Sequence, residues 1–445
     1  MTRRDFSWFR MDASRNLMVI NSVLMFDGEL DFERLRATIE QRLPNYARFT
    51  QKVVARFGRP HWETDTSFDI RRHVQLQVQD RVFDKQSLKQ QLDAVALAPL
   101  PADRPLWHMT VIQHPGNGYA IVFRLHHCIT DGEGLVHVLK HLTDDSQDHG
   151  QAPSLEWHPK HARPAVHPIC KRAHRALFWS RITAQLGRLA LLLPDLKTRL
   201  KRPLSQDKSL ICLPAIELNL VRSIAKRMNA TINDVWVAAV SHALRLYLQE
   251  QGEAVDSKPL RSAVTFNLRN KSDAFLLGNH FGLVAMTMPT DIAEPKEQLR
   301  QVNARMRAIK ASHQPHATMF FLTLTGYLPR ALQSLVLRMF TSKGSAVLTN
   351  VEGPALPRYL AGTRMTDVMC WVPQAGTMGV GFALVSYAGQ IQVSLFSDRN
   401  QVQYPERLSE LLIQAFAVMD RATQDQMAPT QAAPVAANGG QPAFG

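Results

Sequence analysis

Apolar residues recur along several stretches of the chain at intervals of three or four positions. Between residues 31 and 43 they mark one face of a helix, which Pro44 ends. The same spacing starts at Leu135, after a short loop, and continues to Leu142. Helices are therefore predicted at 31–43, 135–142, 217–228, 233–248 and 407–419.

Shorter apolar runs without helical spacing predict β-strands. Residues 17–26 fit a buried strand better than a signal peptide, because Asn21 and Ser22 interrupt the run and no small-residue cleavage site follows. Residues 114–118 are strong turn formers between two runs, which predicts a hairpin. Strands are predicted at 17–26, 106–112, 119–125, 264–268, 282–288, 346–349, 379–387 and 390–397. This mixture indicates an α/β (α+β) protein.

The patterned stretches fall into two groups, separated by polar and basic sequence. A chain of 445 residues suits either two or three domains or one fold built from two large halves. The final stretch is rich in Ala, Gln, Pro and Gly and has no core-forming pattern, so we expect disorder there. The predicted divisions are an N-terminal half at 1–165, a basic amphipathic linker at 166–205, a C-terminal half at 206–421 and a disordered tail at 422–445.

The net charge of +14 indicates an anionic partner, whether nucleic acid, an anionic membrane or a polyanionic small molecule. Part of this excess is local, because residues 171–202 hold nine basic residues and one acidic residue. Phe178 and Trp179 belong to an apolar set in the same segment. The segment fits a solvated helix between two halves and equally a helix on a membrane or lipid-droplet surface, and the two roles are compatible.

Several classes of protein are disfavoured by what the sequence contains. It has no apolar run long enough to span a membrane, and none of its four cysteines forms a CxxC pair. It has no zinc-finger spacing and no recognisable RNA-binding motif, so we expect no nucleic-acid partner. We therefore expect a cytoplasmic protein, bound peripherally to the inner face of the membrane.

The segment from His126 to Gly132 is the strongest candidate for chemistry, because a predicted strand ends there and a helix follows. A histidine is well suited to moving protons at neutral pH, and a hydroxyl nucleophile needs such a base. Neighbouring side chains at a strand end point apart, so one histidine can face a substrate while the other does not. Asp131 can fold back to fix the loop, and Gly132 permits a tight turn.

Other interpretations of this segment remain open. Two adjacent histidines can simply be a hydrogen-bonded pair near the surface, and their spacing is a weak zinc pattern. Cys128 suggests a thiol nucleophile, but its neighbour His127 faces the other way on a strand.

The sequence resembles the bacterial wax ester synthase/diacylglycerol acyltransferase family of HHxxxDG acyltransferases. The similarity extends over about residues 10–420, and its elements occur in the family's order. One departure is Glu352, which stands where the family usually has proline, and another is the absence of a His-Val-Gly element before residue 26. The matching elements are His126-His127-x-x-x-Asp131-Gly132, Pro105-Leu106-Trp107, Asn233-Asp234-Val235, Gly278-Asn279 and Thr349-Asn350-Val351-x-Gly353-Pro354.

The resemblance implies a chloramphenicol-acetyltransferase-like fold of two halves with a tunnel between them. It also implies transfer of a long-chain acyl group from acyl-CoA to a fatty alcohol or diacylglycerol, with acyl-CoA as substrate and with no cofactor or metal. His127 would be the general base, and Arg269 is our candidate partner for Asp131. The candidates for substrate or oxyanion contacts are Asn279, Asn350, Trp107 and Asn233.

Structural roles compete with some of these assignments. Thr231-x-x-Asp234 fits a capping box at the start of a helix, and Trp107 fits a core position.

Two other functions also stay open. One is a related acyltransferase that uses a carrier-protein thioester or another hydroxyl or amine acceptor, and the other is a basic membrane- or nucleic-acid-binding protein.

Overall fold

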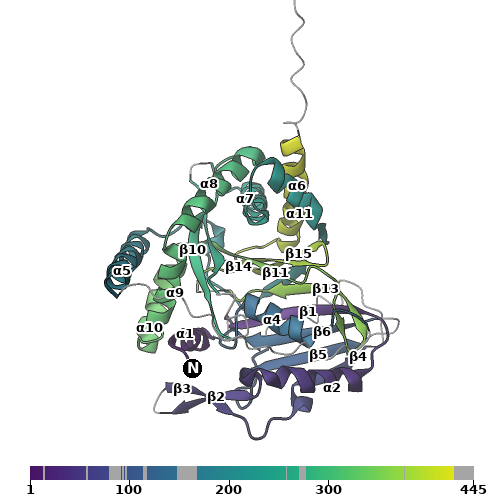
Figure 1. Ribbon diagram of the computed structural model, residues 1–445. Helices are drawn as coiled ribbons and strands as arrows, with labels where there is room; N and C mark the ends of the chain where they lie inside the picture. Colours follow the sequence, from purple (N-terminus) through teal and green to yellow (C-terminus); the bar gives the residue numbers. More distant parts are fainter. Residues whose placement is uncertain are drawn as a thin grey trace, which may run out of the picture.

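The computed structural model places two large β-sheets in layers (Figure 1). It describes the chain except residues 14–15, 57–58, 80–91, 93–94, 96–97, 114–117, 148–167, 257, 270–276, 375 and 425–445.

The first sheet has six strands in the order β12-β13-β1-β6-β5-β4. The predicted hairpin is confirmed by antiparallel pairing of β5 with β6, although residues 114–117 of its turn lie outside the described residues. The strands are β1 (Val19–Asp27), β4 (Val74–Val78), β5 (Trp107–Gln113), β6 (Tyr119–His126), β12 (Tyr359–Leu360) and β13 (Thr363–Trp371).

The second sheet follows the order β10-β9-β11-β14-β15-β7, and the short β8 pairs with β15. β11 is parallel to both of its neighbours, whereas the other pairs are antiparallel. The strands are β7 (Lys208–Cys212), β8 (Ile216–Glu217), β9 (Arg261–Asn267), β10 (Phe281–Thr287), β11 (Ala346–Glu352), β14 (Val380–Tyr387) and β15 (Gln390–Asp398).

Helices cover these sheets and enclose two main cores. α6, α7, α8 and α11 bury apolar side chains against the second sheet, whereas α2 and α4 pack with the first. The helices are α1 (Arg3–Met11), α2 (Phe32–Arg42), α4 (Gly132–Leu142), α5 (Pro168–Leu191), α6 (Leu218–Arg227), α7 (Ile232–Glu250), α8 (Pro295–Ala311), α9 (Gln314–Thr325), α10 (Arg330–Thr341) and α11 (Pro405–Gln424). The smaller elements are β2 (Gln51–Arg56), β3 (Arg59–Thr64) and the 3-10 turns η1 (Leu43–Asn45), η2 (Ala47–Phe49), η3 (Ile70–Arg72) and η4 (Arg199–Lys201).

The α/β class and every helix and strand predicted above are confirmed, with shifts of a few residues at their ends. The capping box at Thr231 and Asp234 is also confirmed. The tail was predicted to begin at residue 422, but α11 continues to Gln424 because its apolar face stays buried as far as Thr423. The rest of the predicted tail lies outside the described residues.

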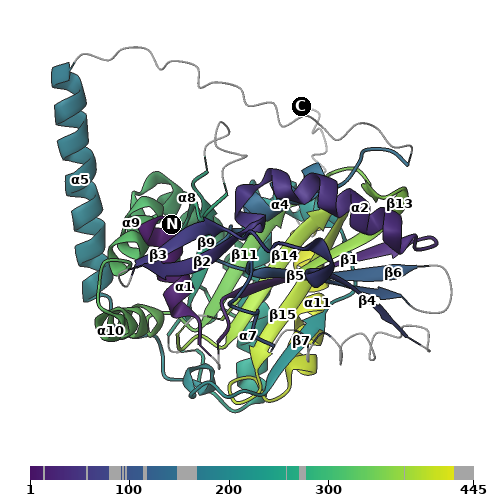
Figure 2. The same cartoon turned by 90° about the horizontal axis from the view of Figure 1, so that it is seen from below.

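The basic segment 171–202 is not one continuous helix. α5 ends at Leu191, three residues before Pro194, and proline disfavours helical geometry in the residue before it. Figure 2 shows α5 standing at one side of the molecule, next to α9. Residues 148–167, which precede α5, are outside the described residues.

Two strands from the second half of the sequence complete the first sheet. β13 pairs along almost its whole length with β1, and β12 extends the sheet beyond it. The two halves are therefore joined by shared strands as well as by packing. The division at residues 165 and 205 stays a prediction.

Candidate functional site

His127 is the first residue after β6, and its backbone N–H donates to the carbonyl of Met18 at 2.7 Å. His126 and His127 point to different surroundings, as adjacent residues at a strand end do. The ring of His126 lies near Phe9, and its Nδ1 accepts the Cys128 N–H at 3.0 Å. His127 instead faces the second half of the chain.

Asn279 fixes the orientation of the His127 ring. Its Oδ1 lies 2.7 Å from His127 Nδ1, while its Nδ2 donates to the His127 carbonyl at 2.8 Å and to Asp5 Oδ1 at 3.0 Å. Because both amide hydrogens are used in these bonds, Oδ1 is the acceptor, and His127 must donate from Nδ1. Asn279 is thus a positioning residue, which leaves it no free hydrogen for the oxyanion role considered above.

Asp5 and Arg48 support this arrangement from the N-terminal half. Arg48 forms an ion pair with Asp5 at 3.0 Å and donates to the carbonyls of Cys128 and Ile129 at 3.1 and 2.7 Å. The Asp5 side chain is 1% exposed. The loop after His127 is therefore held on its backbone side by a buried charged pair.

The His127 ring is enclosed by aromatic side chains. It stacks on Trp8 with ring centroids 4.3 Å apart and planes within 9°, and Phe281 lies 5.7 Å away. Burial lowers the pKa of His127, and the charge of Asp131 opposes this effect only in part. The imidazole is therefore neutral at neutral pH.

Asp131 binds the second half of the chain through both carboxylate oxygens. Oδ1 forms a 2.8 Å ion pair with Arg269 and accepts the Gly134 N–H, which caps α4, while Oδ2 accepts the His280 N–H at 2.7 Å. Arg269 also donates to the Gly278 carbonyl at 2.7 Å. Residues 278–280 thus hold both His127 and Asp131.

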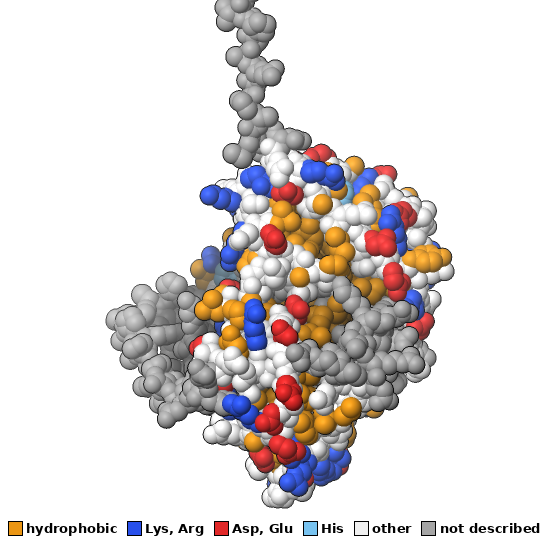
Figure 3. Space-filling view, turned by 90° about the vertical axis from the view of Figure 1, so that its right-hand side faces the viewer, with side chains coloured by type: hydrophobic (Ala, Val, Ile, Leu, Met, Phe, Trp, Pro, Cys, Tyr) orange, Lys and Arg blue, Asp and Glu red, His pale blue; other side chains and the backbone are white. Residues whose placement is uncertain are grey.

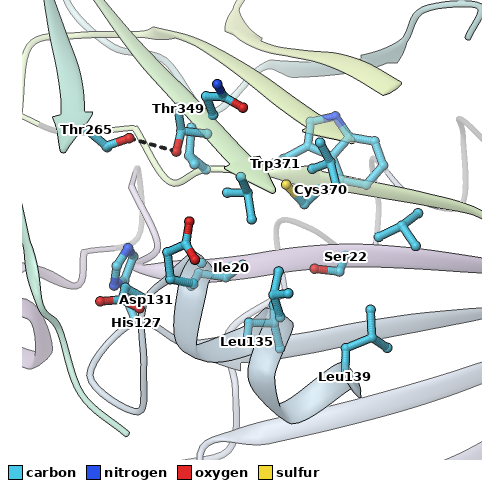
Figure 4. A pocket seen from close by; sticks show the side chains of 18 of the residues that line it. Ile20, Ser22, His127, Asp131, Leu135, Leu139, Thr265, Thr349, Cys370 and Trp371 are labelled. Carbon is cyan, nitrogen blue, oxygen red and sulfur yellow. Dashed lines mark hydrogen bonds between the residues drawn. The ribbon is translucent and has the colours of Figure 1, made fainter. Parts of the chain in front are cut away.

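An apolar pocket lies between the two sheets next to these residues (Figure 4). His127 and Asp131 lie on one side of it, and Cys370 and Trp371 on the other. Apolar side chains from β1, β6, α4, β11, β13 and β14 make up most of its wall. Such a space fits an aliphatic chain whose reactive end faces the histidine.

The structure brings some of the other candidates to this pocket. Asn350 lines it, and its Nδ2 lies 3.5 Å from Oδ1 of Asn233, which connects β11 to the start of α7. Trp107 is not at the pocket. It is buried in the first core, where its Nε1 donates to the Phe49 carbonyl at 2.8 Å and its ring stacks on His73.

Two glycines allow the halves to approach each other here. Gly278 has a φ of +122°, a backbone conformation that residues with a Cβ rarely adopt. Gly132 begins α4 without a positive φ, so the tight-turn explanation does not apply to it. A Cβ at Gly132 would lie 3.0 Å from the Val351 side chain of β11.

The described residues contain no cluster of three or more His, Cys, Asp or Glu side chains arranged to hold a metal ion. Cys128 is buried, and burial raises the pKa of its thiol well above the ordinary range. A buried, protonated thiol is a poor nucleophile.

Sequence reasoning did not find three contributors to the site: Asp5, Trp8 and Arg48. α1 carries the first two, and its only local signal is the spacing Thr2-x-x-Asp5, in which the Thr2 hydroxyl accepts the Asp5 N–H at 3.1 Å. Arg48 gave no local signal, since its hydrogen-bond partners lie 43 or more positions away in the chain.

Two family models match this chain. Residues 1–215 match the wax ester synthase/diacylglycerol acyltransferase catalytic domain, and residues 277–420 match the WS/DGAT C-terminal domain.

Similar proteins and structures agree with these matches. The probable diacyglycerol O-acyltransferase tgs1 of Mycobacterium tuberculosis H37Rv is 26% identical over 412 residues, covering 88% of this chain and 89% of the relative. The probable diacyglycerol O-acyltransferase tgs2 of M. tuberculosis CDC 1551 is 25% identical over 401 residues, with 84% and 87% covered.

Two solved structures share the fold. The wax ester synthase/diacylglycerol acyltransferase from Marinobacter aquaeolei VT8 has a TM-score of 0.68 at 19% identity, covering 94% of this chain and 98% of that one. The first condensation domain of the CDA synthetase has a TM-score of 0.64 at 13% identity, covering 94% and 95%. At these identities the likeness concerns the fold alone.

Proposed function

This chain belongs to the wax ester synthase/diacylglycerol acyltransferase family, and on that premise we propose that His127 is the general base of its acyl transfer. The enzyme moves an acyl group to a hydroxyl, giving wax ester or triacylglycerol. The observation that carries the proposal is the bond between His127 Nδ1 and Asn279 Oδ1.

That bond determines which ring nitrogen can act as the base. With the proton on Nδ1, Nε2 carries the lone pair, and the bond at Nδ1 is the one hydrogen bond that the His127 ring makes among the described residues. The lowered pKa keeps the ring neutral and ready to accept a proton. His127 also lines the apolar pocket.

The chemistry then follows from proton transfer at Nε2. His127 takes the hydroxyl proton of the fatty alcohol or diacylglycerol as the alcohol oxygen attacks the thioester carbonyl of acyl-CoA. The tetrahedral oxyanion collapses, the carbon–sulfur bond breaks, and His127 returns the proton to the departing CoA sulfur. No acyl-enzyme is required.

We assign the oxyanion contact to Asn350. It lines the pocket, and the one side-chain hydrogen bond that it makes among the described residues, to Asn233, is long at 3.5 Å and leaves a second amide hydrogen for the reacting oxygen. Asn233 contacts Asn350, so we assign it the role of positioning the Asn350 side chain. A related acyltransferase using a carrier-protein thioester shares this fold, but no contact in the site favours it.

Contact with a membrane is a further part of the proposal. None of the helices in the described residues combines the length and apolarity needed to cross a bilayer. Most exposed large apolar side chains in that part of the chain gather on α5, α9, α10 and the adjoining loops. They are Leu177, Trp179, Leu191, Leu193, Leu324, Tyr327, Leu332, Leu335 and Met339.

This apolar surface includes part of α5, so we propose that segment 171–202 and α10 together touch the lipid surface that supplies the acceptor. Replacing Leu335 and Met339 by Glu is expected to abolish sedimentation with anionic vesicles. Ile413→Glu, on an exposed position of α11, is the matched control. Equal sedimentation of all three proteins would refute the surface.

The function is tested by comparing the wild type with His127→Ala on a panel of acceptors. Labelled acyl-CoA is supplied with hexadecanol or dioleoylglycerol, and the esters are separated by thin-layer chromatography. We expect wax ester or triacylglycerol from the wild type, and a loss of about a hundredfold or more from the variant. Unchanged ester formation by His127→Ala would refute the base assignment.

A further inference from the structure

A second cavity lies beside the catalytic loop, between α1, residues 201–204 and α10. Met18 lines this cavity, and the Met18 carbonyl accepts the backbone N–H of His127. The cavity therefore reaches a direct neighbour of the proposed base. Its cationic lining residues are Arg10, Lys201, Arg202, Arg330 and Arg338.

These five cations, of which Arg202, Arg330 and Arg338 are exposed and Arg10 and Lys201 are half-buried, have no carboxylate partner among the described residues. Within the described part of the chain, none of the five forms an ion pair, whereas Arg48 and Arg269 each bind a buried aspartate. The one carboxylate that lines the cavity is Asp12. It accepts the Met18 N–H at 2.7 Å, and burial raises its pKa.

The positive charge of the cavity changes the pKa of Arg10. Burial and the neighbouring charge of Arg330 both lower the pKa of Arg10. Its Nη2 donates to the Leu328 carbonyl at 2.7 Å, but its buried Nε has no acceptor among the described residues. Buried donors are usually satisfied, so an anionic ligand would complete this environment.

α10 separates this cavity from the exposed apolar surface. Arg330, Gln333 and Arg338 line the cavity, whereas Leu335 and Met339 are each 55% exposed on the helix. On the opposite side of the molecule, Figure 3 shows Lys and Arg interspersed with Asp and Glu. Five cationic side chains thus line a cavity next to the catalytic loop.

We propose that this cavity binds the phosphate groups of the acyl donor, so that the CoA portion of acyl-CoA occupies it while the acyl chain lies in the apolar pocket. The proposal rests on the proposed function. A guanidinium group pairs with two phosphate oxygens at once, and several arginines suit a ligand with several phosphates. Lipid headgroups carry the same chemistry, but the contact with Met18 favours a ligand whose thioester must reach His127.

The test removes charge from the cavity and phosphates from the donor. The double variant Arg202→Gln/Arg330→Gln is compared with the wild type and with Arg421→Gln, an exposed arginine of α11. Binding of free CoA is measured by calorimetry. KM is measured for palmitoyl-CoA and for palmitoyl-pantetheine, which has the thioester but no phosphate.

We expect the double variant to bind CoA about tenfold more weakly and to show a similar rise in KM for palmitoyl-CoA. Its KM for palmitoyl-pantetheine, and all values of Arg421→Gln, are expected to match the wild type. Unchanged CoA binding would overturn the proposal. Unchanged CoA binding with weaker sedimentation on vesicles of phosphatidylcholine and phosphatidylglycerol in equal parts would assign the cavity to lipid headgroups.

The two proposals fail in different ways. If the wild type forms no ester from either donor, the proposed function fails, while calorimetry with CoA still decides what the cavity binds. If both donors react and the double variant affects them equally, the phosphate site fails and the acyltransfer stands.

Discussion

Two cationic regions lie on either side of α1, and they use their arginines in different ways. At the catalytic loop, Arg48 and Arg269 are paired with Asp5 and Asp131 and hold the backbone in place. In the neighbouring cavity, cations such as Arg330 have no carboxylate partner among the described residues. Paired arginines fix geometry, whereas unpaired arginines leave their donors for a ligand.

The comparison predicts a large difference in stability between equivalent substitutions. Arg269→Met leaves Asp131 as a buried, uncompensated charge and is expected to lower the free energy of unfolding by about 3–5 kcal/mol. Arg338→Met removes an unpaired, exposed cation and is expected to change the free energy of unfolding by less than about 0.5 kcal/mol. Urea unfolding followed by circular dichroism measures both. Equal losses of unfolding free energy in the two variants would contradict the distinction between paired and unpaired arginines.

Positioning of His127 by Asn279 predicts the next largest effect. Asn279→Ala frees the ring to adopt the wrong tautomer, so kcat is expected to fall about a hundredfold. Asn303→Ala, on α8, is the control, because it removes a buried amide that donates to the Asn229 carbonyl. The control is expected to lose stability while keeping kcat. A similar kcat in both variants would contradict the positioning role.

The pH dependence of the reaction tests the electrostatics of the paired region. His127 must be neutral to act as a base, so activity is present above its pKa and is lost as the pH falls through it. Because burial lowers this pKa, the acid limb of kcat/KM should lie below the ordinary histidine value of about 6.5. An acid limb above that value would contradict a buried, neutral base.

The dependence of KM and kcat on ionic strength should also distinguish the two regions, with a smaller effect than the substitutions above. The cavity is open to solvent, so raising the ionic strength is expected to increase the KM for palmitoyl-CoA a few-fold. The buried pairs at the catalytic loop are screened much less, so kcat should stay nearly constant. Steady-state kinetics with palmitoyl-pantetheine provides the reference. An equal salt effect on both donors would argue against phosphate binding in the cavity.

The sequence predicted several elements whose own residues carry the pattern. α7 was predicted from its apolar spacing and its Thr231–Asp234 cap, and the structure agrees to within two residues. β13 was not predicted, because its residues 363–371 alternate weakly and because its pairing with β1 depends on sequence more than 300 positions away.

The same limit applies to the site. The resemblance pointed to His127 and Asp131, because their motif is local, and Arg269 was chosen as a partner for Asp131 because it follows a predicted strand of the second half. Asp5 reaches Asn279 across 274 positions of sequence, and no local pattern encodes that contact. Trp107 was a candidate because its motif is local too, yet the structure buries it in the core.

The central claim is that Asn279 holds His127 as a neutral imidazole with its proton on Nδ1. The most direct measurement is a long-range ¹H–¹⁵N NMR spectrum of ¹⁵N-histidine-labelled protein at neutral pH, with the His127 signal assigned by its loss in His127→Gln. We predict a protonated Nδ1 and an unprotonated Nε2 for that signal. A proton on Nε2, or a doubly protonated ring, would contradict the account.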